Sequence, residues 1–182
     1  AARAMENFFD LGHFPWVHEG ILGNRSRPIT PNMKVENDRE KLHFWYTDPP
    51  KPDDPFPHRR NYTLHRPFSI YQWSEHPNGK TVAVVSPHCP QTQKVCTRFV
   101  LCAERENLVA KQESISNENA FMRNRTVGGQ RIEDLIAEQD REIVENQRPE
   151  EIPLDLAEEL HLKVPDALAM AYRKFMQELG VE

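Results

Sequence analysis

Apolar and polar residues alternate through the middle of the chain, from about residue 41 to residue 103, and this pattern predicts β-strands. Two runs show the alternation clearly: Leu42, Phe44 and Tyr46 in the first, and Phe68, Ile70 and Gln72 in the second. Asn78-Gly79 then precedes the apolar run 81–85, a combination typical of a β-hairpin. Residues 94–102 are expected to form another strand. Strands joined by short turns predict an antiparallel sheet.

Helical spacing replaces the strand pattern toward both ends of the chain. Residues 1–13 are predicted to be helical although no capping residue precedes them, so we expect that the chain is cut from a longer protein or that a partner covers this end. In the C-terminal third, helices are expected at about 116–125, 131–147 and 165–179, with Gly128-Gly129 separating the first two. Strands followed by helices indicate an α+β fold.

Composition narrows the class of protein. The chain has 182 residues, 38% of them apolar and 28% charged, with a net charge of −5, which suits one soluble domain with its own core. Without a basic excess, we expect no nucleic-acid partner. Without a signal peptide or an apolar run of about 20 residues, we expect neither secretion nor a membrane span. The five prolines in residues 48–57 predict a surface loop that could act as a lid.

The cysteines indicate a reducing environment. Cys89, Cys96 and Cys102 form no C-x-x-C pair, so neither a disulfide framework nor a zinc ribbon is expected. Cys96 and Cys102 share parity in a strand-like run, so we expect both to be buried thiols, in a cytoplasmic protein.

A short segment near the N-terminus carries most of the recognisable chemistry. Asp10 and His13 are three residues apart, so on a helix they would share a face. His13 and His18 are five apart, which on a straight helix would direct them about 140° away from each other. Pro15 lies between them and lacks the N–H that a helix needs. A kink at Pro15 could bring both imidazoles to one metal ion.

A third ligand is expected on the predicted helix 131–147. Its apolar stripe comprises Ile132, Leu135, Ile136, Ile143 and Val144, and its acids on the opposite face are Asp134, Glu138, Glu142 and Glu145. Asp140 departs from this pattern because it lies within the apolar stripe, which Gln139 and Gln147 border. A buried carboxylate must be neutralised or coordinated. With the two histidines it would complete the ligand set of the non-haem Fe(II) oxygenases.

Spacing by itself is also compatible with structural roles for these residues and with different chemistry. Asp10 could form a purely structural hydrogen bond with His13, and Asp140 could pair with Arg123 or Arg131. The same three ligands could hold zinc in a hydrolase. A 2-oxoglutarate oxygenase fits less well, since its H-x-D motif comes first and its second histidine far downstream. A non-catalytic ligand-binding module is the remaining alternative.

The segment from Glu6 to His18 resembles the N-x-x-D-x-x-H-x-x-x-x-H signature of Rieske non-haem iron ring-hydroxylating oxygenases. It is most similar to the branch of vanillate and dicamba O-demethylases and phenoxybenzoate dioxygenases. Residues 138–147 resemble the acidic helix that carries the third iron ligand of that branch. The resemblance covers nearly the whole chain. It implies that residues 1–182 are the catalytic domain of the oxygenase component.

The resemblance also implies a role for each residue of the motif. His13, His18 and Asp140 would bind a mononuclear Fe(II), and Asn7 would lie near the iron. Asp10 would orient His13 and carry electrons from the Rieske cluster of a neighbouring subunit. The implied fold is a helix-grip, like that of START and Bet v 1 domains, with a curved antiparallel sheet packed on a long C-terminal helix.

Part of the expected machinery does not occur in the chain. The family holds its [2Fe–2S] cluster with C-x-H and C-x-x-H pairs, and neither pair occurs here, so the Rieske domain would have to be supplied separately. Without it, the chain is expected to be inactive. The resemblance further implies a homotrimer and a ferredoxin or reductase partner that delivers electrons from NAD(P)H.

The expected activity is O2-dependent hydroxylation, dihydroxylation or O-demethylation of an aromatic substrate, as in the catabolism of aromatic hydrocarbons. The expected pocket residues are Trp16, Ile21, Phe44, Trp45, Phe68, Ile70, His88 and Asn119, and His88 is the most promising polar contact among them. Arg25 and Arg27 could attract a carboxylated substrate.

Overall fold

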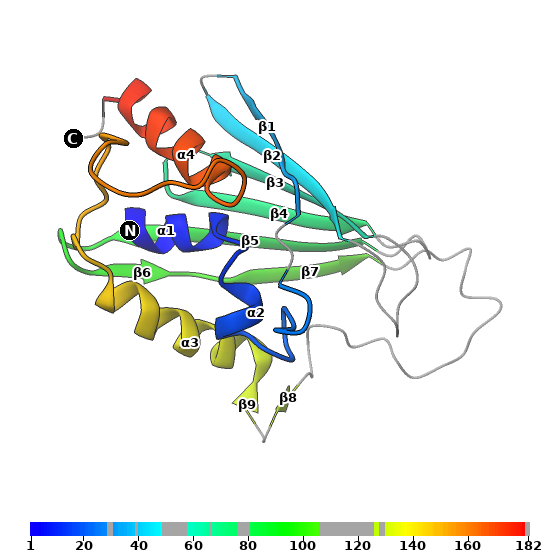
Figure 1. The fold of residues 1–182 in the computed structure, drawn as a ribbon. Helices are drawn as coiled ribbons and strands as arrows, with labels where there is room; N and C mark the ends of the chain where they lie inside the picture. Colours follow the sequence, from blue (N-terminus) through cyan, green and yellow to red (C-terminus); the bar gives the residue numbers. More distant parts are fainter. Residues whose placement is uncertain are drawn as a thin grey trace, which may run out of the picture.

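A single antiparallel sheet forms the body of the molecule (Figure 1). The computed structural model describes residues 1–28, 31–38, 40–48, 58–65, 67–75, 81–105, 126–127 and 130–180. Within them the sheet contains β1 (Lys34–Asn37), β2 (Lys41–Asp48), β3 (His58–His65), β4 (Ser69–Glu75), β5 (Thr81–Pro90), β6 (Cys96–Arg98) and β7 (Leu101–Arg105). The strands β1 to β5 are neighbours in chain order, and both β6 and β7 pair with β5.

Strand β2 shows why this sequence forms a sheet with one buried face. Leu42, Phe44 and Tyr46 are at most 4% exposed, which confirms the predicted alternation. Phe44 lies opposite Tyr62 of β3, and their rings stack with centroids 4.5 Å apart. Aromatic pairs of this kind stabilise neighbouring strands and help to fix their register.

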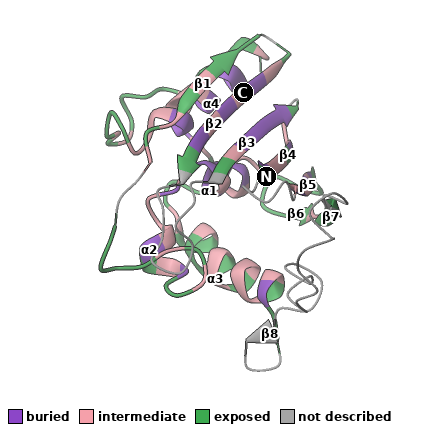
Figure 2. Cartoon of the chain, turned by 90° about the vertical axis from the view of Figure 1, so that its right-hand side faces the viewer, coloured by how far each residue is buried: buried purple, intermediate pink, exposed green. Residues whose placement is uncertain are grey.

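The helices lie on one side of the sheet, as Figure 1 shows. They are α1 (Ala2–Phe9), α2 (Phe14–Val17), α3 (Ile132–Asn146) and α4 (Ala167–Glu178), and a small hairpin of β8 (Thr126–Val127) and β9 (Gln130–Arg131) leads into α3. Helix α4 packs on β1 and β2, and α1 contacts both α3 and α4. Buried segments concentrate between the helices and the sheet (Figure 2). This α+β, helix-grip-like arrangement confirms the predicted fold class.

An ionic cluster fixes α1 against α4 and the segment before it. Glu6 accepts hydrogen bonds from Arg3 Nη1 at 2.8 Å and from Arg173 Nη2 at 2.6 Å. Glu159 accepts a hydrogen bond from Arg3 Nη2 at 2.6 Å and also pairs with Arg173. The Arg173 side chain is only 2% exposed. Paired charges of this kind hold α1 in one position, and with it the segment that follows α1.

Two predicted helices are confirmed, and several details of the prediction are wrong. Helices 131–147 and 165–179 correspond to α3 and α4. The single strand expected at 94–102 is two strands, since Phe99 and Val100 lie between β6 and β7. The two cysteines expected to be buried are not, since Cys102 is exposed and Cys96 is intermediate.

Some predictions lie outside the described residues. These are the helix at 116–125, the proline-rich loop at 49–57, the turn at Asn78-Gly79 and the pair Gly128-Gly129. The antiparallel pairing of β4 with β5 on either side of that turn is as predicted. Among the described helices, none has the length and apolar character that crossing a membrane requires.

Candidate metal centre

The segment that carries the histidines leaves α1 earlier than the sequence predicts. Helix α1 ends at Phe9, and Asp10 has extended backbone angles of φ −88° and ψ 94°. The Asp10 side chain caps the turn that follows, because its Oδ1 accepts a hydrogen bond from the Gly12 N–H at 2.8 Å. The predicted helix 1–13 is therefore wrong beyond Phe9. A turn, and not a shared helix face, brings Asp10 toward His13.

The predicted kink at Pro15 is also absent. His13 is the N-cap of the short helix α2, and Pro15 lies in its first turn. A proline is well tolerated there, because the first N–H groups of a helix have no partner within the helix. One turn of helix thus separates His13 from His18, and the His18 N–H donates to the Phe14 carbonyl. Pro15 starts this helix and does not bend one.

A glycine allows the next loop to close on α2. The carbonyl of His18 accepts hydrogen bonds from the N–H groups of Ile21 and Leu22, both at 3.0 Å. This turn returns the chain so that Gly23 lies against α2. A Cβ atom at Gly23 would lie 2.5 Å from the Pro15 nitrogen and 2.6 Å from the Phe14 carbonyl carbon. Only glycine permits this approach of two backbones.

Helix α3 supplies the third group. Asp140 Oδ1 lies 2.8 Å from His18 Nε2 and 3.4 Å from His13 Nε2, and the two histidine nitrogens are 3.2 Å apart. The ligand atoms of all three residues lie within 4.8 Å of one another. Their side chains are at most 13% exposed. Two imidazole nitrogens and one carboxylate oxygen that converge in this way fit a divalent metal such as Fe(II) or Zn(II).

The electrostatics of the cluster favour a positive charge between these atoms. Burial tends to raise the pKa of Asp140, but hydrogen bonds from His13, His18 and Asn7 outweigh it and hold that pKa well below its usual range. Burial tends to lower the pKa of His13, but the nearby carboxylates of Asp10 and Asp140 outweigh it and raise this pKa to about 9. The site therefore attracts a proton or a metal cation.

Further residues surround the three candidate ligands. Asp10 Oδ2 lies 3.4 Å from His13 Nδ1, at the limit of a hydrogen bond, and the orientation is poor enough that Nδ1 has no well-formed partner among the described residues. Gln139 Oε1 lies 2.8 Å from His18 Nδ1. Arg98 Nη1 lies 3.9 Å from Asp140 Oδ2. Arg98 is the described arginine near Asp140, whereas Arg131 pairs with Glu133 and Asp134 of α3, and Arg123 lies outside the described residues.

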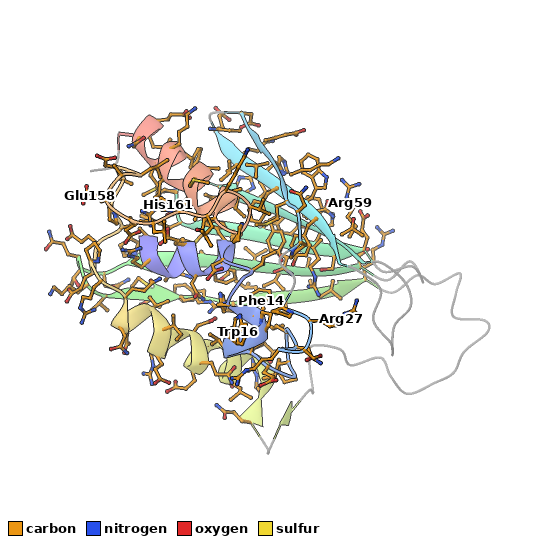
Figure 3. The ribbon with its side chains drawn as sticks, in the orientation of Figure 1. Phe14, Trp16, Arg27, Arg59, Glu158 and His161 are labelled. Atoms are coloured by element: carbon orange, nitrogen blue, oxygen red, sulfur yellow. The ribbon has the colours of Figure 1, made fainter. Side chains whose placement is uncertain are left out.

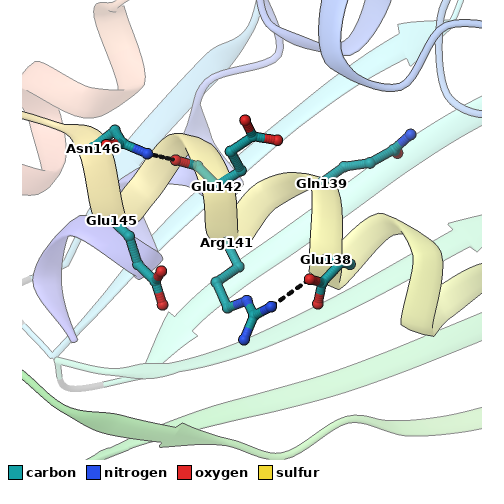
Figure 4. A pocket seen from close by; sticks show the side chains of 6 residues that line it. All are labelled: Glu138, Gln139, Arg141, Glu142, Glu145 and Asn146. Atoms are coloured by element: carbon teal, nitrogen blue, oxygen red, sulfur yellow. Dashed lines mark hydrogen bonds and ion pairs between the residues drawn. The ribbon is translucent and has the colours of Figure 1, made fainter.

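The apolar stripe predicted on α3 is confirmed only in part. Ile132 is 9% exposed, but Ile143 is 41% exposed and does not belong to the buried face. The predicted acids are exposed, as expected: Asp134, Glu138, Glu142 and Glu145. A depression of about 330 Å³ lies beside this helix, and Figure 4 shows the six residues that line it. All six belong to α3 and none of them is a histidine, although one of them, Gln139, contacts His18.

The expected pocket residues lie in different environments. Phe44 and Ile70 are each 1% exposed within the core. Trp16 is 55% exposed on α2 (Figure 3). Ile21, Trp45 and Phe68 are intermediate, and Asn119 lies outside the described residues. Their roles as substrate contacts stay predictions.

His88 is the one of these residues with an unusual environment. It is 3% exposed on β5, its Nδ1 donates to the Ser86 carbonyl at 3.3 Å, and its Nε2 has no partner among the described residues. Its ring packs edge-on against Phe8, with the ring centroids 5.5 Å apart. The Arg98 guanidinium carbon lies over the Phe8 ring, 4.5 Å from its centroid. His88 is thus linked to the surroundings of Asp140 through two side-chain contacts.

The two arginines expected to attract a substrate lie on the surface. Arg25 pairs with Glu19 at 3.0 Å and donates to the Trp16 carbonyl at 3.1 Å. Arg27 is exposed, and Figure 3 shows it near the loop after α2.

Known proteins resemble this chain over its whole length. The family model for the vanillate O-demethylase oxygenase C-terminal domain matches residues 1–182. Methylxanthine N1-demethylase NdmA from Pseudomonas putida is 25% identical over 185 residues, which cover 98% of this chain and 47% of that protein. The probable methylxanthine N7-demethylase NdmC from Pseudomonas sp. (strain TJI-51) is 24% identical over 197 residues, covering 98% of this chain and 61% of that protein. The chain therefore spans about half of NdmA and three fifths of NdmC.

Solved structures share the fold. The structure of Pseudomonas putida CBB5 NdmA with caffeine superimposes with a TM-score of 0.72 at 23% sequence identity, over 98% of this chain and 47% of that one. The NdmA QL mutant with theobromine gives 0.71 at 22% identity, over 98% and 46%. The fold, the convergent histidines and aspartate, and the match of the family model over all 182 residues agree. The chain therefore belongs to the family of vanillate O-demethylase oxygenase C-terminal domains.

Proposed function

We propose that this domain uses O2 to demethylate or hydroxylate an aromatic ring at a mononuclear Fe(II). The observation that carries the proposal is the convergence of His13 Nε2, His18 Nε2 and Asp140 Oδ1 from two separate parts of the chain. These atoms would hold the iron on one side. Such a set leaves positions of the metal open for O2, which is the chemistry that iron supplies in oxygenases with two histidines and one carboxylate.

The surrounding residues would orient these ligands for metal binding. A histidine that binds through Nε2 must be neutral, with its proton on Nδ1. Asp10 lies 3.4 Å from His13 Nδ1 and can accept that proton's hydrogen bond. Arg98 and Asn7 lie beside Asp140 and favour its ionised form. The cluster is therefore suited to bind a divalent cation and to release protons when it does so.

Asp10 is also the proposed route for electrons. Its side chain is 43% exposed, so one carboxylate reaches both His13 and the protein surface. This exposure supports a contact between Asp10 and a separate Rieske domain that holds a [2Fe–2S] cluster. Two electrons per turnover would come from NAD(P)H through a reductase or ferredoxin. We also propose that the protein is a homotrimer in which each Rieske domain supplies electrons to the metal centre of a neighbouring subunit.

The substrate class follows from the relatives. The family model is named for vanillate O-demethylase, and two relatives are named as methylxanthine demethylases. We therefore favour a planar aromatic or heteroaromatic substrate with a methyl group on oxygen or nitrogen, released as the demethylated ring and formaldehyde. Dihydroxylation is the less favoured outcome. His88 is the proposed polar contact, since its buried Nε2 has no partner among the described residues.

Metal analysis of the protein prepared without oxygen tests this proposal. The full chain is expected to hold one iron per protein chain. His13→Ala is expected to reduce the iron content at least tenfold because it removes one of three ligands. Glu19→Ala is a control, since Glu19 pairs with Arg25 on the surface near His18 and is not a candidate ligand.

Two results would contradict the iron site. One is stoichiometric zinc with hydrolytic turnover, which would indicate a zinc hydrolase with the same ligands. The other is full iron content in His13→Ala, which would place the metal elsewhere.

A further inference from the structure

We propose that Gln139 is a positioning residue that fixes the His18 imidazole for metal binding through Nε2. The inference rests on the proposed iron site and extends it to a residue whose side chain is not a ligand. The carrying observation is that two consecutive residues of α3 contact opposite ends of one ring. Gln139 Oε1 lies 2.8 Å from His18 Nδ1, and Asp140 Oδ1 lies 2.8 Å from His18 Nε2.

The arrangement depends on helix geometry. Successive residues of an α-helix project about 100° apart, so Gln139 and Asp140 diverge from α3 and leave a gap that a side chain can enter. His18 fills that gap and is completely buried. Figure 4 shows Gln139 leaving α3 on a different side from the exposed Glu138–Arg141 pair. The helix therefore holds the ring by both nitrogens.

Hydrogen-bond chemistry fixes what Gln139 contributes. If Nε2 binds the metal, Nδ1 must carry the proton, and a buried N–H needs an acceptor. The amide oxygen of Gln139 is such an acceptor at a suitable distance. It also opposes rotation of the ring by 180°, since that rotation would place a C–H against Oε1 and remove Nε2 from the metal. Gln139 thus determines both the tautomer and the orientation of His18.

The two histidines are supported by different chemical groups. His13 Nδ1 faces the carboxylate of Asp10 at a longer distance of 3.4 Å, and His18 Nδ1 faces a neutral amide at 2.8 Å. The shorter and better-formed contact belongs to His18. We infer that the neutral amide holds the geometry of the site without adding a second negative charge beside it.

Two measurements on variants of Gln139 test the inference: the affinity for a metal ion and the stability of the metal-free protein. Gln139→Leu keeps the approximate size of the side chain and removes the acceptor. The Kd for Co(II), measured on the full chain by chelator competition, is expected to rise about 10- to 100-fold in this variant. Gln139→Glu keeps an acceptor at the same place and is expected to stay within about threefold of the wild type. The melting temperature of the metal-free protein is expected to be unchanged in both variants.

A matched control separates this role from a general effect of removing an amide. Gln147→Leu makes the same change at the C-cap of α3, where the amide oxygen has no partner among the described residues. It is expected to bind Co(II) with wild-type affinity. Wild-type affinity in Gln139→Leu would overturn the inference, as would an equal loss in Gln139→Leu and Gln139→Glu.

A spectroscopic measurement covers the case in which a variant folds poorly. In the Co(II)-loaded wild type, the Nδ1–H protons of both ligand histidines are expected as separate, paramagnetically shifted resonances that exchange slowly with water. Gln139→Leu should accelerate exchange of one and leave the other unchanged. Unaltered exchange of both would overturn the inference. If His13→Ala also keeps its metal, the proposed function itself fails; if only Gln139→Leu keeps it, the failure is confined to Gln139.

Discussion

His88 is a buried histidine whose charge the fold opposes. Burial, together with the positive charge of Arg98, lowers its pKa from 6.5 to about 4. In the unfolded chain the same group takes up a proton below about pH 6.5. Between pH 6.5 and 4 the unfolded state therefore binds more protons than the folded state, and stability must fall as the pH falls through this window.

The substitution His88→Gln tests this linkage. The glutamine amide could still donate to the Ser86 carbonyl but could not titrate. When the pH falls from 6.5 to 4, the drop in the free energy of unfolding should therefore be smaller in the variant than in the wild type, by up to about 3 kcal/mol. The measurement is the free energy of unfolding by urea at several pH values. His65→Gln is the control, because His65 is exposed and its replacement should leave the pH dependence unchanged. Parallel pH profiles for wild type and His88→Gln would contradict the assignment.

The sequence predicts the three residues that converge at the candidate metal centre, but it does not predict all the residues that surround them. Asp140 is identifiable because a carboxylate interrupts an apolar stripe, a signal that lies within one helix. Arg98 and Gln139 give no such signal. Arg98 reaches Asp140 only because β6 pairs with β5, and Gln139 contacts His18 only because α3 lies beside α2. These are tertiary contacts, and a pattern along the chain does not contain them.

Among the elements, α1 matters most for the site because the chain from Asp10 to His18 begins where α1 ends. Four charged side chains hold α1 in place, and Arg173 of α4 is the most buried of them. Its guanidinium donates to Glu6 and to the Pro153 carbonyl. Removing one partner of a buried ionic cluster leaves the others without compensation.

Arg173→Met should therefore destabilise the fold by about 3 kcal/mol, since it leaves Glu6 with Arg3 as its remaining cation. Denaturant unfolding of the metal-free protein measures this change. The neighbouring Lys174 is exposed on the same helix, and Lys174→Met should change stability by less than about 0.5 kcal/mol. Equal effects of the two substitutions would show that the cluster is not stabilising.

The element predictions succeed where burial on one face controls the pattern. Strand β2 and helix α3 are examples, because each has a side against the core. The end of α1 at Phe9 is not apparent from the same pattern, because Phe8, Leu11 and Phe14 continue a helical spacing of apolar residues. A local hydrogen bond, from the Gly12 N–H to Asp10, decides the backbone there. The spacing of apolar residues does not reveal that this hydrogen bond replaces another turn of helix.

At the scale of the whole molecule, the metal would join two parts of the chain that are more than 120 residues apart. His13 and His18 lie near the N-terminus, and Asp140 lies on α3. A ligand that binds only the folded state stabilises it by mass action. The metal is thus expected to act as a cross-link between α2 and α3.

Adding Fe(II) without oxygen at 100 times its Kd should stabilise the protein by about 2.7 kcal/mol. Hydrogen exchange should slow both at residues 10–18 and at residues 132–146, because both segments must separate for the metal to leave. Calorimetry and exchange mass spectrometry measure the two effects. His13→Ala should show neither, and protection limited to one segment would exclude the proposed cross-link.

Gly23 shows that a metal centre can depend on a residue that is not one of its ligands. Its backbone lies against Pro15 and Phe14, where no Cβ fits. Any other residue would push the loop away from α2 and alter the spacing between His13 and His18. When natural variants or engineered libraries of this domain are interpreted, a change at position 23 should therefore be grouped with changes to the ligands. Distance along the chain from the nearest histidine would misclassify it as a neutral loop substitution.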